Sequence, residues 1–145
     1  MGFHFRFSAL LKQRRYELKQ AQLELARARQ SHDQALSAQK ELGKKIILWQ
    51  ETWRRDQSKG ITVNQHLLSR DYLLSLEREL DRADLRAAQK AKELDERIVH
   101  LLECEKKVKM LEILQEKDLN AFKSGCAQRD QKILDEMATL RREIR

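Results

Sequence analysis

The sequence predicts an all-α fold: two long helices in an antiparallel coiled-coil hairpin, with the second helix longer than the first and overhanging it. Three observations predict this fold. The 145 residues include no proline and only four glycines, so few residues suit the turns that sheets and enzyme folds require. Charged residues make up 37% of the chain and aromatic residues 6%. Apolar residues recur at heptad spacing, which favours long helices over disorder.

The first predicted helix covers residues 8–57, about 75 Å at 1.5 Å per residue. Ser8 is expected to cap its N-terminus, with Phe7 packing just outside. The heptad positions form two series, one with Leu11, Leu18, Leu25, His32, Gln39, Ile46 and Trp53 and the other with Arg14, Ala21, Ala28, Ala35, Leu42 and Trp49. Because much of the second series is alanine, a neighbouring helix can approach closely.

A turn is predicted at residues 58–63. Gly60 suits the left-handed conformation that commonly ends a helix. Thr62 and Gln65 have the spacing of a capping box, which starts the next helix. Because the link is so short, the two helices are expected to run antiparallel, side by side.

The second predicted helix covers residues 64–144, so the whole chain, 1–145, is expected to form a single coiled-coil hairpin. Its heptad positions are Leu73, Leu76, Leu80, Ala83, Ala87, Ala91, Leu94, Ile98, Leu101, Val108, Leu111, Gln115, Leu119 and Phe122. The first helix reaches only to about residue 115, which leaves roughly the last 25 residues unpaired. An apolar stripe is therefore expected to face solvent or a partner; it comprises Leu119, Phe122, Ile133, Met137, Leu140 and Ile144.

The composition argues against an enzyme, because paired helices bury a stripe and enclose no large active-site cavity. His100 and Cys104 would supply only two of four zinc ligands, and Cys126 has no partner at zinc-ligand spacing. We therefore expect no metal and no cofactor. No apolar segment has the length of a membrane span or a signal peptide, so a soluble, intracellular protein is expected.

Basic residues gather near both ends of the chain, whose net charge is +7. An antiparallel hairpin is expected to bring Arg14 and Arg15 towards Arg141 and Arg142 at its open end. Such a cluster favours an acidic partner: nucleic acid, an anionic membrane or an acidic protein cavity. Charge alone does not choose among them.

Two tryptophans lie four residues apart near the closed end. Trp49 and Trp53 share one helical face, and Tyr72 and Leu76 return beside them on the second helix. Packing across the seam explains them, but two indoles are bulky for a two-helix seam, so an exposed anchor for a partner is the second interpretation.

Several short motifs resemble the FliJ family of flagellar export proteins. They are the opening Phe3-His4-Phe5-Arg6-Phe7 with Leu10-Leu11, the aromatic segment Trp49-Gln50-Glu51-Thr52-Trp53-Arg54, the turn Gly60-Ile61-Thr62 and the tail Gln131-Lys132-Ile133-Leu134-Asp135-Glu136. The resemblance covers essentially the whole chain, although each motif is short.

The resemblance implies a stalk-like coiled coil of the flagellar type III export apparatus, cytoplasmic and held at the inner membrane by its partners. Family members bind the hexameric export ATPase, contact the membrane export-gate protein and escort export chaperones. The resemblance places gate binding at Trp49, Trp53, Tyr72 and Leu76. We assign ATPase-pore binding to Arg14, Arg15, Arg141 and Arg142 from charge and position.

Three alternatives stay open at this point. One is a homologous stalk of injectisome secretion, since the choice of the flagellar system rests mainly on Gly60-Ile61-Thr62. Another is a basic coiled coil that binds nucleic acid or anionic membrane, although acidic residues are interleaved with the basic ones and aromatic residues to stack bases are lacking. The third is a scaffold that self-associates through its C-terminal stripe.

Overall fold

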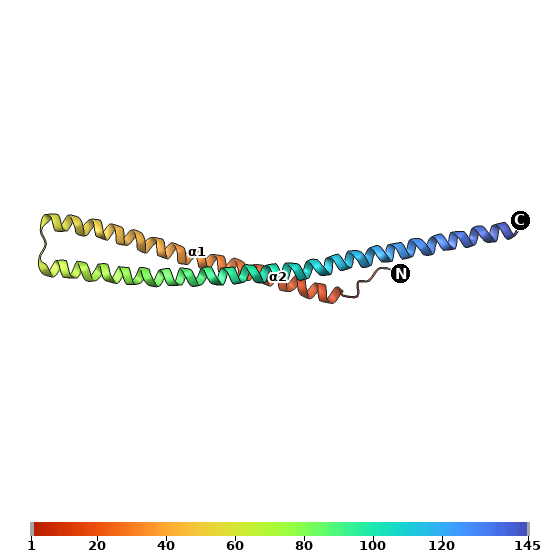
Figure 1. Ribbon diagram of the computed structural model, residues 1–145, viewed down its shortest axis with the longest axis horizontal. Helices are drawn as coiled ribbons and strands as arrows, with labels where there is room; N and C mark the ends of the chain where they lie inside the picture. The colour runs from red at the N-terminus through yellow and green to blue at the C-terminus, as the bar shows by residue number, and fades with distance from the viewer. Residues whose placement is uncertain (1, 145) are drawn as a thin grey trace. The chain divides into compact units, whose positions relative to one another are not determined.

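The computed structural model describes residues 2–144, which form an all-α hairpin (Figure 1). Helix α1 covers Ser8–Lys59 and helix α2 covers Val63–Ile144, and the described residues include no strand. The second helix is longer and overhangs the first, so the predicted fold class is confirmed. α1 continues two residues beyond the expected end, and α2 begins one residue before the expected start.

The turn between the helices has the predicted chemistry. Gly60 has a φ of 86°, the left-handed conformation that side chains disfavour. The Thr62 backbone N–H donates to Oε1 of Gln65 at 3.1 Å, and the Gln65 N–H donates to Oγ1 of Thr62 at 3.2 Å. The capping box is therefore formed, and it satisfies two backbone donors at the start of α2.

The start of α1 differs from the prediction. The carbonyl of Phe7 accepts the first helical hydrogen bond, from Leu11 at 2.9 Å. The N–H of Ser8 donates to the carbonyl of Phe5 at 3.2 Å. Phe7 therefore occupies the cap position and Ser8 is the first helical residue, so the expectation that Ser8 caps the helix was wrong.

The chain packs as two compact units, and the unit of residues 21–101 contains the turn. Its helices are antiparallel, as three contacts between them show. Arg97 pairs with Glu24, the Gln39 amide donates to Asp84, and the ring of Trp49 lies against that of Tyr72. Residue numbers therefore rise along α1 in the direction in which they fall along α2. The buried side chains are Ala21, Leu25, Ala35, Ile46, Leu76, Ala83 and Ala87. All of them belong to the predicted heptad series.

The second unit joins the described residues up to Gln20 with those from Leu102 onward. Phe5, Leu11 and Val108 form its buried core, against which Phe3, Leu18, Leu111 and Leu114 pack. Arg15 pairs with Glu112 at 3.3 Å, so α1 and α2 are antiparallel in this unit too, and Arg6 pairs with Asp118 at 3.6 Å. Cys104 is also buried, at a seam position that the sequence analysis left out.

The segment before α1 covers more of α2 than the helix alone would. The rings of Phe3 and Phe122 lie 5.6 Å apart, and both Leu119 and Phe122 are half-buried. The prediction that these two residues face solvent was wrong, because it counted only the helix as cover. Residues 127–144 are all exposed, and we call this segment the tail.

The N-terminal segment should therefore contribute to stability although it is not helical. Replacing Phe5, which is 3% exposed, with alanine removes the ring at the centre of its core, and we expect a local loss of about 3 kcal/mol. Hydrogen exchange should accelerate at the amides of residues 108–122, with little change in residues 21–101. Phe7→Ala is the matched control, because Phe7 is 36% exposed. Equal effects of the two variants would contradict this account.

Candidate functional site

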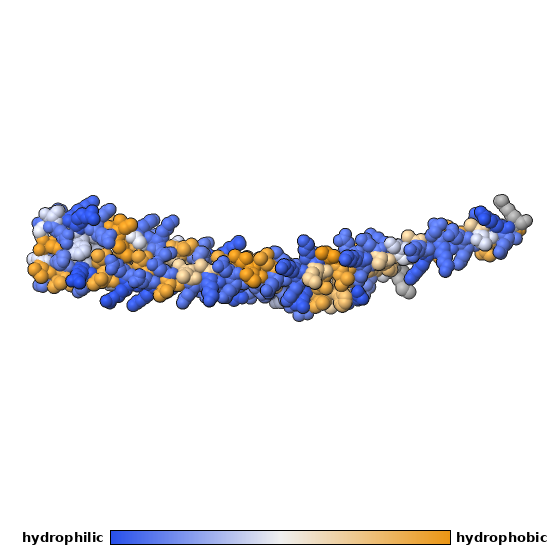
Figure 2. All heavy atoms as spheres, in the orientation of Figure 1, coloured by the Kyte–Doolittle hydropathy of each residue, from blue (hydrophilic) through white to orange (hydrophobic). Residues whose placement is uncertain are grey.

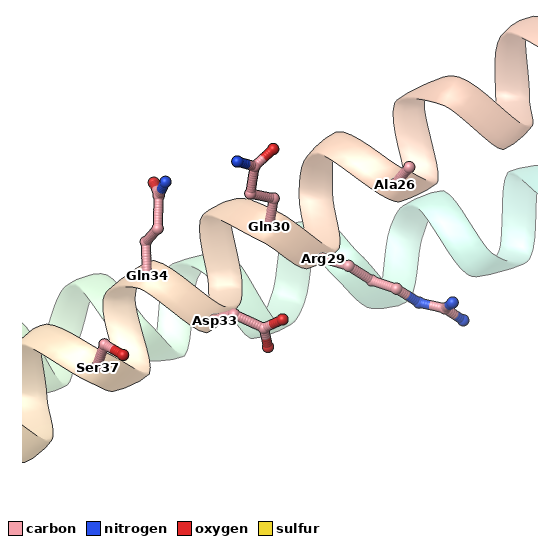
Figure 3. Close-up of a pocket in the computed structure, with 6 residues that line it drawn as sticks. All are labelled: Ala26, Arg29, Gln30, Asp33, Gln34 and Ser37. Carbon is pink, nitrogen blue, oxygen red and sulfur yellow. The ribbon is translucent and has the colours of Figure 1, made fainter.

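A hollow on the surface of α1 does not have the features of an active site. Figure 3 shows a hollow lined by Ala26, Arg29, Gln30, Asp33, Gln34 and Ser37, all from α1, with side chains that point in different directions. A hollow built on one helix cannot surround a substrate. Across residues 2–144, no three His, Cys, Asp or Glu side chains are placed to hold a metal ion. Two exposed surfaces among the described residues are candidates for docking a partner.

Neither α1 nor α2, within the described residues, contains a stretch that is long and apolar enough to cross a bilayer.

The first candidate surface lies around Trp49 and Tyr72. Their rings meet edge-on, with centroids 4.6 Å apart and planes at 69°. The indole Nε1 of Trp49 donates to the carbonyl of Ser69 at 3.3 Å, which fixes the ring against α2. Tyr72 is 42% exposed. The pair therefore presents an oriented tyrosine ring to solvent, with a half-buried indole beside it.

Trp53 lies four residues closer than Trp49 to the end of the hairpin, and its ring has different contacts. Its ring lies against His66, with centroids 5.2 Å apart. Its Nε1 is buried and has no hydrogen-bond partner among the described residues. The sequence analysis missed His66, although the residue lies seven positions before Leu73 and thus continues the heptad series. A buried indole N–H without a hydrogen-bond partner costs stability.

Leu76 does not reach this surface. It is only 3% exposed, because it belongs to the seam between α1 and α2. Its side chain therefore offers almost no area to a partner. We define the aromatic surface as Trp49, Trp53, His66 and Tyr72.

The four predicted arginines are not brought together. Arg14 pairs with Glu17 one turn along at 3.0 Å, and Arg15 pairs with Glu112 on α2. Arg141 lies 29 residues beyond Glu112 on the same helix, roughly 44 Å away at 1.5 Å per residue. The expected approach of the two arginine pairs was therefore wrong, because the overhang of α2 separates them.

Arg141 and Arg142 belong to a second candidate surface, on the tail. Both are exposed, and neither forms an ion pair within residues 2–144. They line one hollow together with Leu134, Met137 and Ala138. Leu134 and Met137 are 59% and 57% exposed. The tail thus presents apolar and basic groups side by side with no cover, which is typical of a helix that docks into a groove.

Comparison with known protein families gives a match over most of the chain. The family model described as "Flagellar FliJ protein" matches residues 3–143, nearly the whole chain. Neither a curated protein nor a solved structure matches.

The two indoles should respond differently to loss of their N–H groups. Trp49→Phe removes a hydrogen bond, so we expect it to lower the free energy of unfolding by about 1–2 kcal/mol. Trp53→Phe removes a buried N–H that has no partner, so its cost should stay below about 1 kcal/mol. Guanidinium unfolding followed by circular dichroism measures both. The reverse order would show that Trp53 is the better satisfied indole.

Proposed function

Because the chain belongs to the FliJ family of flagellar export-related coiled-coil proteins, we propose that it is a non-enzymatic stalk of the flagellar type III export apparatus. In this role the tail enters the central pore of the hexameric export ATPase and stimulates ATP hydrolysis. The aromatic surface contacts the membrane export-gate protein. The chain also escorts export chaperones, and it works in the cytoplasm at the inner membrane, held there by these partners.

The exposed tail is the observation that carries this proposal. Residues 127–144 form the last five turns of α2, and nothing in the described chain covers them. Their large apolar side chains are Ile133, Leu134, Met137, Leu140 and Ile144, each at least half exposed. A single helix is narrow enough, at about 10–12 Å, to enter the pore of a protein ring. Burial of this stripe by the pore would provide the binding energy.

The four arginines divide between the tail and the first two turns of α1. Ion pairs engage Arg14 and Arg15, whereas Arg141 and Arg142 are unpaired among the described residues. Acidic residues in the pore would attract the unpaired pair more strongly, because no existing ion pair has to be broken. We therefore assign the main electrostatic contribution to Arg141 and Arg142, and a smaller one to Arg14 and Arg15.

The gate contact rests on the aromatic surface. Tyr72 supplies exposed area, and Trp49 and Trp53 supply rigid, half-buried rings behind it. Tyrosine and tryptophan are enriched among residues that dominate binding energies, because they bury large areas at little cost in entropy. Leu76 contributes by holding these rings in place.

The three alternative functions, an injectisome stalk, a nucleic-acid binder and a self-associating scaffold, have less support. The family match is to flagellar proteins, which favours the flagellar over the injectisome system. A nucleic-acid site at the tail is disfavoured because Asp130, Asp135, Glu136 and Glu143 lie among its basic residues, and it contains no aromatic residue. Self-association of the tail would compete with pore binding for the same apolar stripe.

Charge reversal separates the two arginine pairs. Arg141→Glu with Arg142→Glu should raise the concentration needed for half-maximal ATPase stimulation roughly tenfold, because it places acidic groups against an acidic pore. Arg14→Glu with Arg15→Glu should have a smaller effect, and reversal of all four should abolish stimulation. Lys106→Glu with Lys107→Glu is the matched control, since both lysines are exposed on the same unit. If the four-residue variant stimulated ATP hydrolysis as the wild type does, the assignment of these arginines to pore binding would be wrong.

Replacement of the exposed tyrosine tests the gate contact. We expect Tyr72→Ala to weaken binding to the export-gate protein roughly tenfold while the melting temperature changes little, because the residue is 42% exposed. Trp49→Ala with Trp53→Ala should weaken binding further and also lower stability. Leu85→Ala, at a residue 67% exposed and three turns away, is the control. Calorimetry measures affinity, and wild-type affinity in Tyr72→Ala would exclude this surface.

A further inference from the structure

The end of the hairpin carries a local excess of positive charge. We define the tip as residues 54–70, which surround the turn. It holds four basic residues and one acidic residue, a net charge of +3; the basic residues are Arg54, Arg55, Lys59 and Arg70. The next fourteen residues, 71–84, hold five acidic and two basic residues, a net charge of −3. On α2 the excess of positive charge thus ends at Arg70.

These basic groups are available to a partner. All four residues are exposed, and the ion pairs among residues 2–144 lie outside the tip. Asp56 is the tip's single acidic residue. The positive field at the turn is therefore not neutralised by neighbouring side chains.

The same tip exposes large apolar side chains on the first two turns of α2. Val63 is 75% exposed, Leu67 47% and Leu68 69%. Consecutive helical residues point about 100° apart, so Leu67 and Leu68 lie on either side of the face directed away from the seam. Figure 2 shows apolar and polar groups intermixed at this end of the hairpin. The apolar groups therefore point in several directions around the turn.

Basic and apolar groups also border one hollow at the turn. Lys59 from α1 and Ile61 and Leu68 from beyond the turn line it, together with Asp56, Gly60, Gln65 and Ser69. A charged nitrogen, one carboxylate and two aliphatic side chains thus line the same hollow. A phospholipid offers both matching chemistries, a phosphate and an acyl chain.

We propose that the tip docks on the surface of an anionic lipid bilayer. Val63, Leu67 and Leu68 enter the boundary between headgroups and acyl chains, and the four basic residues contact lipid phosphates. A fluid bilayer covers side chains that point in several directions at once, whereas a protein groove covers one face of a helix. This contact goes beyond the proposed function, because it uses neither the tail nor the aromatic surface.

Vesicle flotation of the full-length protein tests the proposal. The protein should float with vesicles of phosphatidylethanolamine and phosphatidylglycerol, and remain at the bottom with vesicles of phosphatidylcholine alone. Arg54→Gln, Arg55→Gln and Lys59→Gln together should lower the partition coefficient ~100-fold, at roughly fivefold for each charge lost near an anionic surface. Leu67→Gln with Leu68→Gln should lower the partition coefficient at least about tenfold, because binding needs the apolar side chains as well as the basic ones.

Matched variants outside the tip test whether binding depends on the tip itself or only on the net charge of the protein. Lys106→Gln, Lys107→Gln and Lys109→Gln remove three exposed charges outside the tip, and Leu85→Gln with Val99→Gln removes two exposed apolar groups. Both should float like the wild type, and far-ultraviolet circular dichroism should show equal helicity throughout. Equal loss in the lysine variant would overturn the proposal in favour of net charge alone. Failure to float with anionic vesicles would also overturn it, as would equally tight binding of polyglutamate, which would indicate an acidic protein partner.

Discussion

Burial of small side chains between α1 and α2 is the interaction on which the rest of the structure depends. Ala21, Ala35, Ala83 and Ala87 are each less than 9% exposed, and they let the two backbones approach closely. Alanine buries little area, so the pairing is a sum of many weak contacts along the seam. Larger apolar residues such as Leu25, Ile46 and Leu76 share the seam with these alanines, whereas the apolar residues of the tail lie outside it and stay exposed.

The place where this pairing ends decides what the chain can bind. The aromatic segment before α1 carries the cover as far as Phe122, through Phe3 and Phe5. Beyond it α2 continues as a helix with no partner inside the described chain. An amphipathic helix is stabilised mainly by packing of its apolar face, so the tail gains most from a partner that supplies the missing face. The family assignment identifies the kind of assembly in which to look for that partner.

Heptad spacing predicted the seam well because it reports which helical face is buried. Every predicted heptad position on α1 is buried or half-buried, and the turn chemistry of Gly60 and Thr62 is local. Spacing could not predict the N-terminal cover, because the aromatic segment has no helical period. It also could not show that Leu76 is buried away from a partner or that Arg15 and Arg141 lie far apart, since those facts depend on tertiary packing and on the relative offset of the helices.

The central claim is that the two helices of one chain pair with each other in antiparallel order. Light scattering coupled to size-exclusion chromatography tests it most directly. The account predicts a mass of 17.2 kDa at every concentration in the low micromolar range, because the seam is satisfied within one chain. A stable species of twice that mass that persists when Met137 and Leu140, both 57% exposed in the tail, are replaced by glutamate would contradict the account. Self-association of the tail could not explain such a species, so the helices would have to pair between chains.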